Sequence, residues 1–171
     1  MNRKKHENFV RRVYRSIENE TDVESVSLPT RRLDRFDHWL TGTEYQQELF
    51  MAFRQVKSNH HFLESYLELE NKFTNFYADL FALDKPYLVF TEDSSSKSYD
   101  MFFQEERDLR SFKTKIISSL REEERYDFMF PGLGVLSTGY NDISTYLYFE
   151  NEKEINQIEI LANQHELYLL K

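Results

Sequence analysis

The chain has no cysteine, and only four glycines and three prolines occur among its 171 residues. The absence of cysteine excludes disulfide bonds, thiolate metal sites and a cysteine nucleophile, and it is typical of a reducing compartment. No segment approaches the roughly 18 apolar residues that a membrane-spanning helix needs. The first 17 residues also lack the apolar run and the cleavage site of a secretory signal. We therefore expect a cytoplasmic protein without a membrane anchor.

Large apolar side chains are plentiful. Fifteen phenylalanines, eleven tyrosines and one tryptophan bring the aromatic content to 16%, and hydrophobic residues make up 40% of the chain. Aromatic side chains bury large areas when they pack together, and 171 residues is a usual length for one folded unit. The sequence therefore predicts a single domain over residues 1–171.

Charge is distributed unevenly along the chain. The formal net charge of −8 disfavours nucleic-acid binding, because phosphate backbones attract basic surfaces. The first 35 residues nevertheless carry +3, from nine basic and six acidic residues, so the other 136 residues carry −11. We expect the basic N-terminal helix to dock on this acidic remainder. The alternative is that it contacts nucleic acid, an anionic membrane or an acidic protein.

Helical periodicity dominates the first half of the chain, residues 1–83. Apolar residues at helical spacing predict helices over about 3–19 and 33–40. Residues 43–82 contain no glycine or proline. They predict either one long helix or, as we favour, two helices separated near Lys57-Ser58-Asn59. Thr43 and Gln46 have the spacing of a capping box at the start of this segment.

Strand-like patterns dominate the second part, residues 86–171, which predicts the order β-α-β-β-β-α-β. The strands are expected at 87–91, 126–130, 133–138, 144–149 and 166–170, and the helices at 104–121 and 151–164. Residues 92–98 are interpreted as a polar loop. The expected fold class is α+β, with a helical N-terminal half followed by a mostly antiparallel sheet of about five strands and helices packed on one face. The strand at 144–149 has no clearly polar face, which predicts a central position in the sheet.

Three of the four glycines lie in one segment, FPGLGVLSTGYNDISTYLYF at residues 130–149. Their spacing does not fit the dinucleotide fingerprint. It does not fit a P-loop either, because Tyr140 and Asn141 stand where lysine and a hydroxyl residue are needed. We interpret the glycines as turn residues, with Pro131-Gly132 at the centre of a type II turn and Gly139 in a second turn. The sequence therefore predicts no cofactor.

A small group of acidic and histidine residues is the strongest candidate for catalysis. Asp34, Asp37 and His38 would share one helical turn if residues 33–40 were helical, and a carboxylate beside a histidine is the starting point for a general base. No nucleophile motif accompanies them, and nearby arginines favour surface ion pairs instead. His60 and Glu64 have a spacing that could share a metal ion on a helix, but no third ligand is near them. No metal site is predicted.

Acidic residues recur at the ends of predicted strands and at the start of the last helix. Together with one tyrosine they form the predicted partner-binding set, which is Glu92, Asp93, Tyr140, Asp142, Glu150 and Glu152. If these loops meet at one end of the sheet, the tyrosine could anchor a basic protein partner while the carboxylates steer its approach. Ordinary solvation and helix capping explain the same residues without a partner.

The last third of the chain resembles small acidic α+β proteins of bacteria, including immunity proteins that neutralise toxins. The resemblance rests on Phe130-Pro131-x-Leu133-Gly134, on Asp142 with the aromatic strand at 146–149, and on the apolar run at 167–170. It covers about a quarter of the chain, and it assigns no site residue.

Two functions of different kinds follow from these observations. The first is a non-catalytic, acidic protein-binding module, such as an inhibitor or immunity protein, that presents carboxylates and tyrosines to a basic partner. The alternative is an enzyme or nucleic-acid-associated factor whose site is assembled from Asp34, Asp37, His38 and His60. Self-association through the long helices is a further possibility.

Overall fold

The secondary structure of the chain comes from a computed structural model that describes residues 3–19, 28–47, 52–94, 98–141 and 143–171. In chain order the elements are α1 (Arg3–Asn19), β1 (Thr30–Asp34), α2 (Gly42–Gln47), α3 (Phe53–Val56), α4 (His60–Leu83), β2 (Tyr87–Ser94), β3 (Ser98–Glu105), α5 (Leu109–Leu120), β4 (Asp127–Phe130), β5 (Val135–Asn141), β6 (Ser144–Phe149), η2 (Glu152–Glu154), α6 (Ile155–Gln164) and β7 (Tyr168–Leu170). None of the helices in these ranges is both long and apolar enough to cross a membrane.

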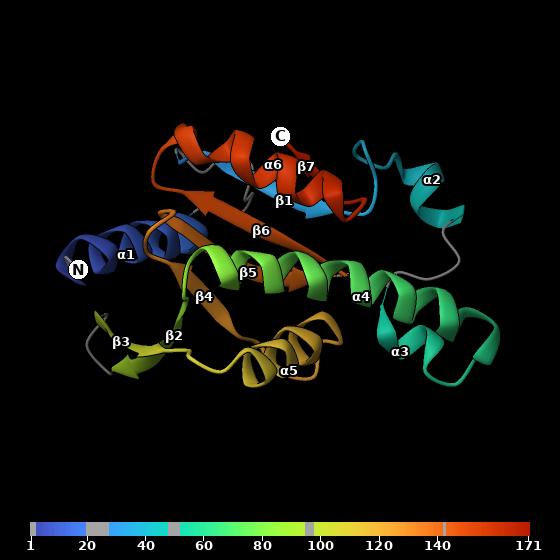
Figure 1. The fold of residues 1–171 in the computed structure, drawn as a ribbon, viewed down its shortest axis with the longest axis horizontal. Coiled ribbons are helices and arrows are strands. Elements are labelled where there is room, and N and C mark those ends of the chain that lie inside the picture. Colours follow the sequence, from blue (N-terminus) through green and yellow to red (C-terminus); the bar gives the residue numbers. More distant parts are fainter. Residues whose placement is uncertain (1–2, 20–27, 48–51, 95–97, 142) are drawn as a thin grey trace.

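Seven strands form one sheet in the order β3-β2-β4-β5-β6-β1-β7 (Figure 1). Every neighbouring pair in this order is antiparallel. The predicted α+β class and the antiparallel sheet are therefore confirmed. The sheet has two strands more than the five expected, because β1 and β3 were not recognised as strands.

Strand β6 takes the central position that its sequence predicts. It lies between β5 and β1, and its burial is nearly complete along its length. Leu147 and Phe149 enter the larger core cluster on one face of the sheet, while Tyr148 enters a second cluster on the other face. The strand lacks a polar face because both of its faces are covered.

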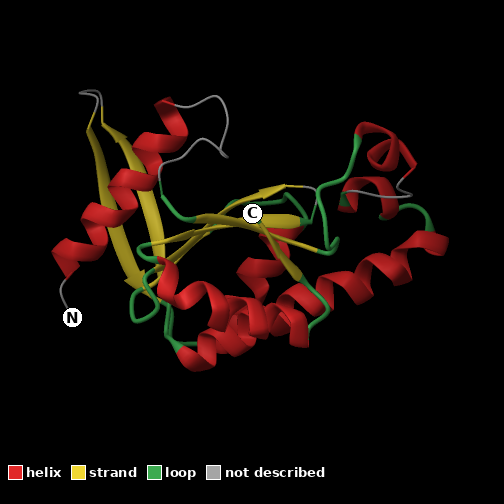
Figure 2. Ribbon diagram, turned by 90° about the horizontal axis from the view of Figure 1, so that it is seen from above, coloured by secondary structure: helices red, strands yellow, loops and turns green. Residues whose placement is uncertain are grey.

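Helices cover the two faces of the sheet unequally. Helices α4, α5 and α6 lie together against one face (Figure 2), as predicted, and the larger core cluster lies between them and the sheet. Phe73 and Phe76 of α4, Phe112 of α5, and Phe128 and Phe130 of β4 are fully buried there. Helix α1 packs against the opposite face, so the helices are not confined to one side as the sequence suggested.

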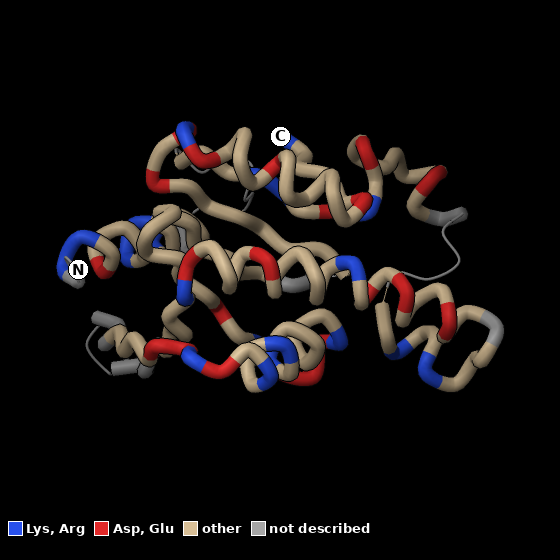
Figure 3. Tube along the Cα trace, in the orientation of Figure 1, with Lys and Arg blue, Asp and Glu red and all other residues tan. Residues whose placement is uncertain are grey.

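The basic helix α1 docks on its own chain, as the sequence predicts. Phe9, Val10 and Val13 are almost completely buried against β2, β3, β4, β5 and β6. Polar contacts add to this apolar stripe. Lys5 Nζ lies 2.7 Å from Glu150 Oε2, and the Tyr14 hydroxyl donates a 2.7 Å hydrogen bond to Asp127 Oδ2. Figure 3 shows basic residues (blue) recurring along α1.

The helix predicted at 33–40 is wrong. Residues Thr30–Asp34 form β1, which pairs with β6 on one side and β7 on the other, and the chain bends after Asp34. Leu33 is fully buried in this position. The pairing partners are more than a hundred residues away in sequence, so a local pattern carries no sign of them.

The polar loop predicted at 92–98 is wrong at both of its ends, while residues 95–97 lie outside the described residues, and the helix start predicted at 104 is wrong as well. Strand β2 continues to Ser94, and β3 pairs with it along all eight residues from Ser98 to Glu105. Helix α5 begins only at Leu109, where the Asp108 side chain caps it by accepting a hydrogen bond from Ser111 N. Aspartate is among the strongest N-cap residues, which explains the position of this start.

The break predicted near residues 57–59 is confirmed, since α3 ends at Val56 and α4 begins at His60. The segment before the break contains two short helices, α2 and α3. Its capping box is formed by Thr41 and Glu44, whereas Thr43, the predicted N-cap, lies inside α2. Glu44 N donates to Thr41 Oγ1 at 3.3 Å, and Thr41 N donates to Glu44 Oε2 at 2.8 Å. The reciprocal pair fixes the start of α2 two residues earlier than predicted.

The glycine-rich turn between β4 and β5 binds a carboxylate of its own chain. The amides of Gly132 and Leu133 donate to Asp84 Oδ2 at 2.7 and 3.0 Å. The type II turn predicted at Pro131-Gly132 is wrong, because the positive φ of 62° occurs at Gly134. A side chain on Gly132 would also lie 3.0 Å from Asp84 Oδ1. Two amides that could have contacted a phosphate already have an anionic partner.

Candidate functional site

The candidate site begins where β1 ends and the chain turns away from the sheet. Asp34 is 4% exposed, and its Oδ1 accepts hydrogen bonds from Arg35 N at 2.7 Å and Phe36 N at 3.3 Å. These bonds form the tight turn that aspartate side chains favour after a strand. Arg32 Nε lies 2.7 Å from Asp34 Oδ2, an ion pair in which the N–H is not aligned well enough for a hydrogen bond.

Burial dominates the electrostatics of Asp34. It raises the pKa of the Asp34 carboxyl above its ordinary value, and this effect outweighs the lowering by Arg32 and by the amides of Arg35 and Phe36. The carboxylate nevertheless has a partner for each oxygen. The buried Asp34 carboxylate therefore stabilises the turn that follows β1 and is not accessible to solvent.

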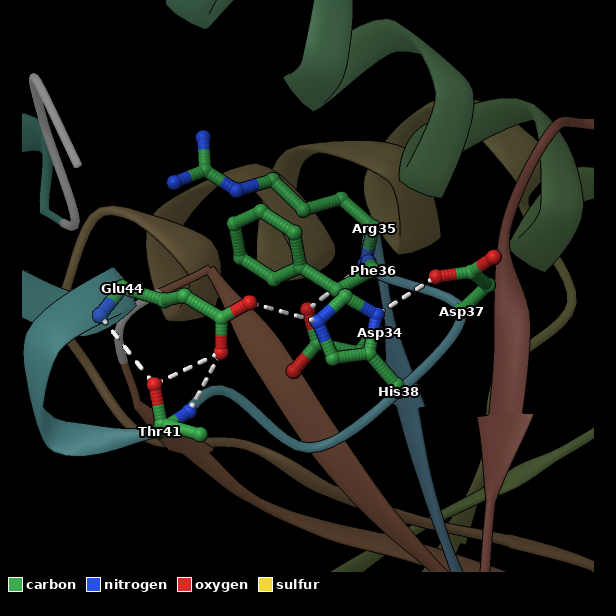
Figure 4. Close-up of polar contacts among 7 residues, drawn as sticks. All are labelled: Asp34, Arg35, Phe36, Asp37, His38, Thr41 and Glu44. Carbon is green, nitrogen blue, oxygen red and sulfur yellow. Dashed lines mark hydrogen bonds and ion pairs between the residues drawn. The ribbon is translucent and has the colours of Figure 1, made fainter. Parts of the chain in front are cut away.

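The loop that follows holds His38 between two carboxylates (Figure 4). His38 Nδ1 lies 2.7 Å from Asp37 Oδ1, and Nε2 lies 3.3 Å from Glu44 Oε1. The hydrogen bond to Asp37, followed by that to Glu44, raises the pKa of the His38 imidazole. The pKa of Asp37 is lowered mainly by His38, and the pKa of Glu44 is lowered mainly by hydrogen bonds from Thr41. Both carboxylates therefore remain ionised at neutral pH.

A small hollow of about 100 Å³ opens beside this loop. Its walls come from the end of β1, the loop, α2 and the last residues of the sheet: Arg32, Asp34, Phe36, His38, Trp39, Leu40, Tyr45 and Leu170. Trp39 and Tyr45 are 37% and 46% exposed. We call the exposed residues Asp37, His38, Trp39 and Tyr45, together with the half-buried Glu44 and this hollow, the Trp39 surface.

Two contacts fix the indole of Trp39. Its Nε1–H donates a 2.8 Å hydrogen bond to the backbone carbonyl oxygen of Lys171, and the Arg32 guanidinium carbon lies 5.2 Å from the ring centroid. A guanidinium over an indole face is a favourable cation–π geometry. The side chain is therefore held in place before any ligand arrives, which reduces the entropy lost on binding.

The polar groups of this loop already have structural roles. Glu44 is part of the capping box of α2 as well as the partner of His38, and the Thr41 hydroxyl donates to Glu44 Oε2 at 2.8 Å. The hydroxyl nearest to His38 in this network is therefore held by the helix cap and not by the imidazole. The arrangement suits an ordered loop that links β1 to α2 better than nucleophilic catalysis, which needs a base on its nucleophile.

We expect the His38 imidazole to titrate above the ordinary value of about 6.5. Its folded-state pKa is raised, so its contribution to stability is fully present below the unfolded pKa and is lost as the pH rises through the folded pKa. NMR titration of the ring protons measures this value directly. Asp37→Asn should lower the pKa of His38, because the bond to Asp37 is the largest cause of its shift.

The matched control is Asp79→Asn, which removes the carboxylate that lies 2.8 Å from His165 Nε2. This change should leave the His38 titration unaltered. A wild-type pKa at or below the ordinary value would contradict the loop geometry.

The six residues predicted to bind a partner are divided between the two ends of the sheet. Only the backbones of Glu92, Asp93 and Tyr140 are described, and Asp142 lies outside the described residues. Pairing of Asn141 with Ser144 places the β5–β6 turn at one end of the sheet, whereas pairing of Val135 with Phe149 places Glu150 at the other. Glu150 is ion-paired with Lys5 and its side chain is 17% exposed, while Glu152 is exposed. Their role in binding stays a prediction.

The four residues of the alternative site are partly brought together. Asp37 and His38 are in contact, and Asp34 lies at the start of the same loop. The Asp37 carboxylate contacts His38, whereas the Asp34 carboxylate accepts its hydrogen bonds from backbone amides. His60 begins α4, and the structure describes no hydrogen bond or ion pair between it and the other three. Within the described ranges, no three histidine, aspartate or glutamate residues are grouped to hold a metal ion.

Trp39, Tyr45 and Glu44 are the residues that sequence reasoning missed. The T-x-x-E spacing of Thr41 and Glu44 is a capping signature, and it could have been found. The exposure of the single tryptophan could not have been predicted, because its position depends on Leu170 and Lys171, more than 130 residues later in the sequence.

Comparisons with protein-family models, with curated proteins and with solved structures find no match to this chain.

Proposed function

We propose that this protein is a non-catalytic binding module that captures a basic protein partner through the Trp39 surface. The observation that carries the proposal is the exposure of Trp39 and Tyr45 in the wall of a hollow that is also lined by His38, which contacts two ionised carboxylates, Asp37 and Glu44. Tryptophan and tyrosine are the residues most often found at the energetic centre of protein interfaces. An indole already fixed by Lys171 and Arg32 is a suitable anchor.

The size of the hollow favours a side chain over a metabolite. Small-molecule sites usually enclose roughly 300–1,000 Å³, whereas this hollow measures about 100 Å³. A single side chain of a partner protein fits that scale. The aromatic walls suit the apolar stem of a lysine or arginine, whose charge would be attracted by Asp37 and Glu44, the carboxylates that contact His38.

Charge supports a basic partner. The net charge of −8 favours approach of a cationic surface, and the lowered pKa values of Asp37 and Glu44 keep both groups negative well below neutral pH. Arg32, the arginine that lines the hollow, is paired with Asp34.

The predicted residues Glu92, Asp93, Tyr140, Asp142, Glu150 and Glu152 remain candidates for further contacts. An inhibitor or immunity protein that covers a basic site on its target is the finer class that we propose.

Trp39→Ala should weaken binding of the partner at least about thirtyfold, which corresponds to the roughly 2 kcal/mol that defines an interface anchor. The partner is first isolated by affinity capture from the source cells, then purified and titrated calorimetrically against wild type and variant. The single tryptophan also reports binding by its fluorescence. Raising the salt concentration should slow association, because charges steer the approach.

Ile160→Ala is the matched control for this experiment. Ile160 is 62% exposed on α6, so its truncation removes a comparable exposed apolar side chain outside the Trp39 surface. Its affinity should equal that of wild type. Failure to recover any partner, or equal binding by Trp39→Ala, would refute the proposed function.

A further inference from the structure

The two edges of the sheet differ in length. Strand β7 forms one edge and has three residues, whereas β3 forms the other and has eight. A free edge strand presents a row of unpaired backbone N–H and C=O groups, and proteins usually keep such strands short or block them. Within the described part of the chain, no strand pairs with the outer side of β3. The long edge is therefore open to another extended strand.

The face of the β2–β3 hairpin that points away from α1 carries two exposed aromatic residues. Phe90 of β2 and Phe102 of β3 are direct partners across the ladder, so they lie side by side on one face. Their exposed fractions are 39% and 47%. On the other face, Val89 and Met101 are buried against α1. Two neighbouring exposed phenylalanines on a free edge are typical of a contact surface.

More apolar surface lies at the base of the same hairpin. Leu83 ends α4 four residues before β2, and Leu109 begins α5 four residues after β3. Their exposed fractions are 54% and 39%. Half of the exposed large hydrophobic residues of the described chain therefore lie on this hairpin or beside it. Figure 1 shows the hairpin projecting from the side of the sheet opposite β7.

We propose that β3 pairs in antiparallel fashion with β3 of a second copy of this chain. A free edge is completed by another free edge of similar length, and β7 is too short to serve. A two-fold axis perpendicular to the sheet, passing near Phe102, keeps each face of the two sheets on the same side. Phe102 would then lie opposite Phe102 of the second copy, and the two Phe90–Phe102 pairs would form one aromatic row across four strands.

The positions of the acidic residues along β3 are compatible with this pairing. Glu105 is neutralised by Arg107, whose Nη2 lies 2.7 Å from Glu105 Oε2. The other acidic residue of β3, Asp100, falls opposite Gln104 of the second copy in the register centred on Phe102. No like charges of the two strands are directly opposed, which is the arrangement that antiparallel pairs require. The net charge of −8 still opposes association at long range, and salt screens that repulsion over about 8 Å at physiological ionic strength.

The contact area predicts the strength of the dimer. In this register residues 99–105 of the two strands pair, and seven residues of antiparallel strand are roughly 24 Å long at about 3.4 Å per residue. A contact of that length, with the exposed phenylalanines beside it, is at the low end of interface sizes, below roughly 1,200 Å². We therefore expect a dissociation constant in the micromolar range. The dimer is independent of the proposed function, because the Trp39 surface adjoins β1 and β7 at the opposite edge of the sheet.

Sedimentation velocity of the whole protein tests the dimer. Wild type should change from monomer to dimer as its concentration rises through the micromolar range, and added sodium chloride should strengthen the association. Phe102→Lys places two cations opposite each other and should weaken the dimer at least about tenfold. Ile160→Lys on α6, the matched control for a new surface lysine, should dimerise as wild type does. Circular dichroism checks that each variant is folded.

Disulfide crosslinking tests which residues of the two β3 strands lie opposite each other. Because the chain has no cysteine, Phe102→Cys can form a disulfide only between two copies, and opposed residues of an antiparallel pair lie close enough for one. Mild oxidation should give a covalent dimer with this variant and much less with Ile160→Cys. The proposal is overturned by a wild type that stays monomeric to about 200 µM, well above a micromolar constant. A dimer that survives Phe102→Lys, a dimer that salt weakens, or equal crosslinking of the two cysteine variants would overturn it as well.

Discussion

Phe112→Ala should lower the free energy of unfolding by about 4 kcal/mol, within the usual 3–5 kcal/mol range for a buried phenylalanine. Phe112 is completely buried on α5 and lies at the centre of the larger core. Its ring centroid is 4.9 Å from that of Phe128 on the sheet and 5.2 Å from that of Phe81 on α4. Because the ring joins two helices to the sheet, the neighbours cannot close the cavity without moving a whole element.

Urea denaturation followed by circular dichroism measures the loss. For a chain of this size, about 4 kcal/mol corresponds to a fall of roughly 8–16 °C in Tm. Leu109→Ala on the same helix is the matched control, since Leu109 is 39% exposed, and it should cost less than about 1 kcal/mol. A loss below about 2 kcal/mol for Phe112→Ala would mean that α5 does not pack on the sheet as described.

The elements that could be predicted are those whose local pattern agrees with their tertiary role. Helix α4 buries one apolar row, and its start follows the break that Lys57-Ser58-Asn59 predicted. Strand β6 has apolar residues on both faces and is covered on both sides. Asn151 accepts a hydrogen bond from Lys153 N at 3.0 Å, and so begins the last helical segment as its sequence indicated. In each case local propensity and long-range packing favour the same structure.

The two strands that the sequence did not predict, β1 and β3, are those in which local propensity and tertiary packing favour different structures. The β1 sequence TRRLD contains three charged residues and good helix formers. It becomes a strand because β6 and β7 supply backbone partners on both sides. Strand β3 ends in a run of residues that suits a helix, yet α1 buries Met101 and β2 pairs with the whole strand. For β1 the strand partners are far away in sequence, and for β3 the covering helix α1 is, so a local pattern does not contain the contacts that decide either case.

The candidate site shows the same division between local and distant information. The pairing of Asp37 with His38 joins neighbours in sequence, and the sequence did single out both residues. The hollow could not be predicted from residues adjacent in sequence, because Leu170 lines it and the Lys171 carbonyl accepts a hydrogen bond from the indole of Trp39. Sequence reasoning therefore found the titratable residues of the loop and missed the aromatic residues that are central to the proposed function.

Arg121→Ala should lower the free energy of unfolding by about 3 kcal/mol, the lower end of the range for breaking a buried ion pair. Arg121 follows α5, and its Nε and Nη2 donate to the two carboxylate oxygens of Glu70 on α4 at 2.6 and 2.9 Å. The Glu70 side chain is 6% exposed, so the variant leaves a buried carboxylate without its cation. The guanidinium carbon also lies 4.5 Å from the ring centroid of Phe53, so α3 loses a contact as well.

A double variant separates the ion pair from packing in this experiment. Glu70→Leu with Arg121→Met replaces both charges by apolar groups of similar size, and such replacements are often neutral or stabilising. Its unfolding free energy should therefore recover most of the loss. Arg107→Ala removes an arginine whose side chain is 81% exposed, and it should cost less than about 1 kcal/mol. If the Arg121→Ala and Arg107→Ala variants unfold at the same urea concentration, the contact between Arg121 and Glu70 does not hold α3, α4 and α5 together.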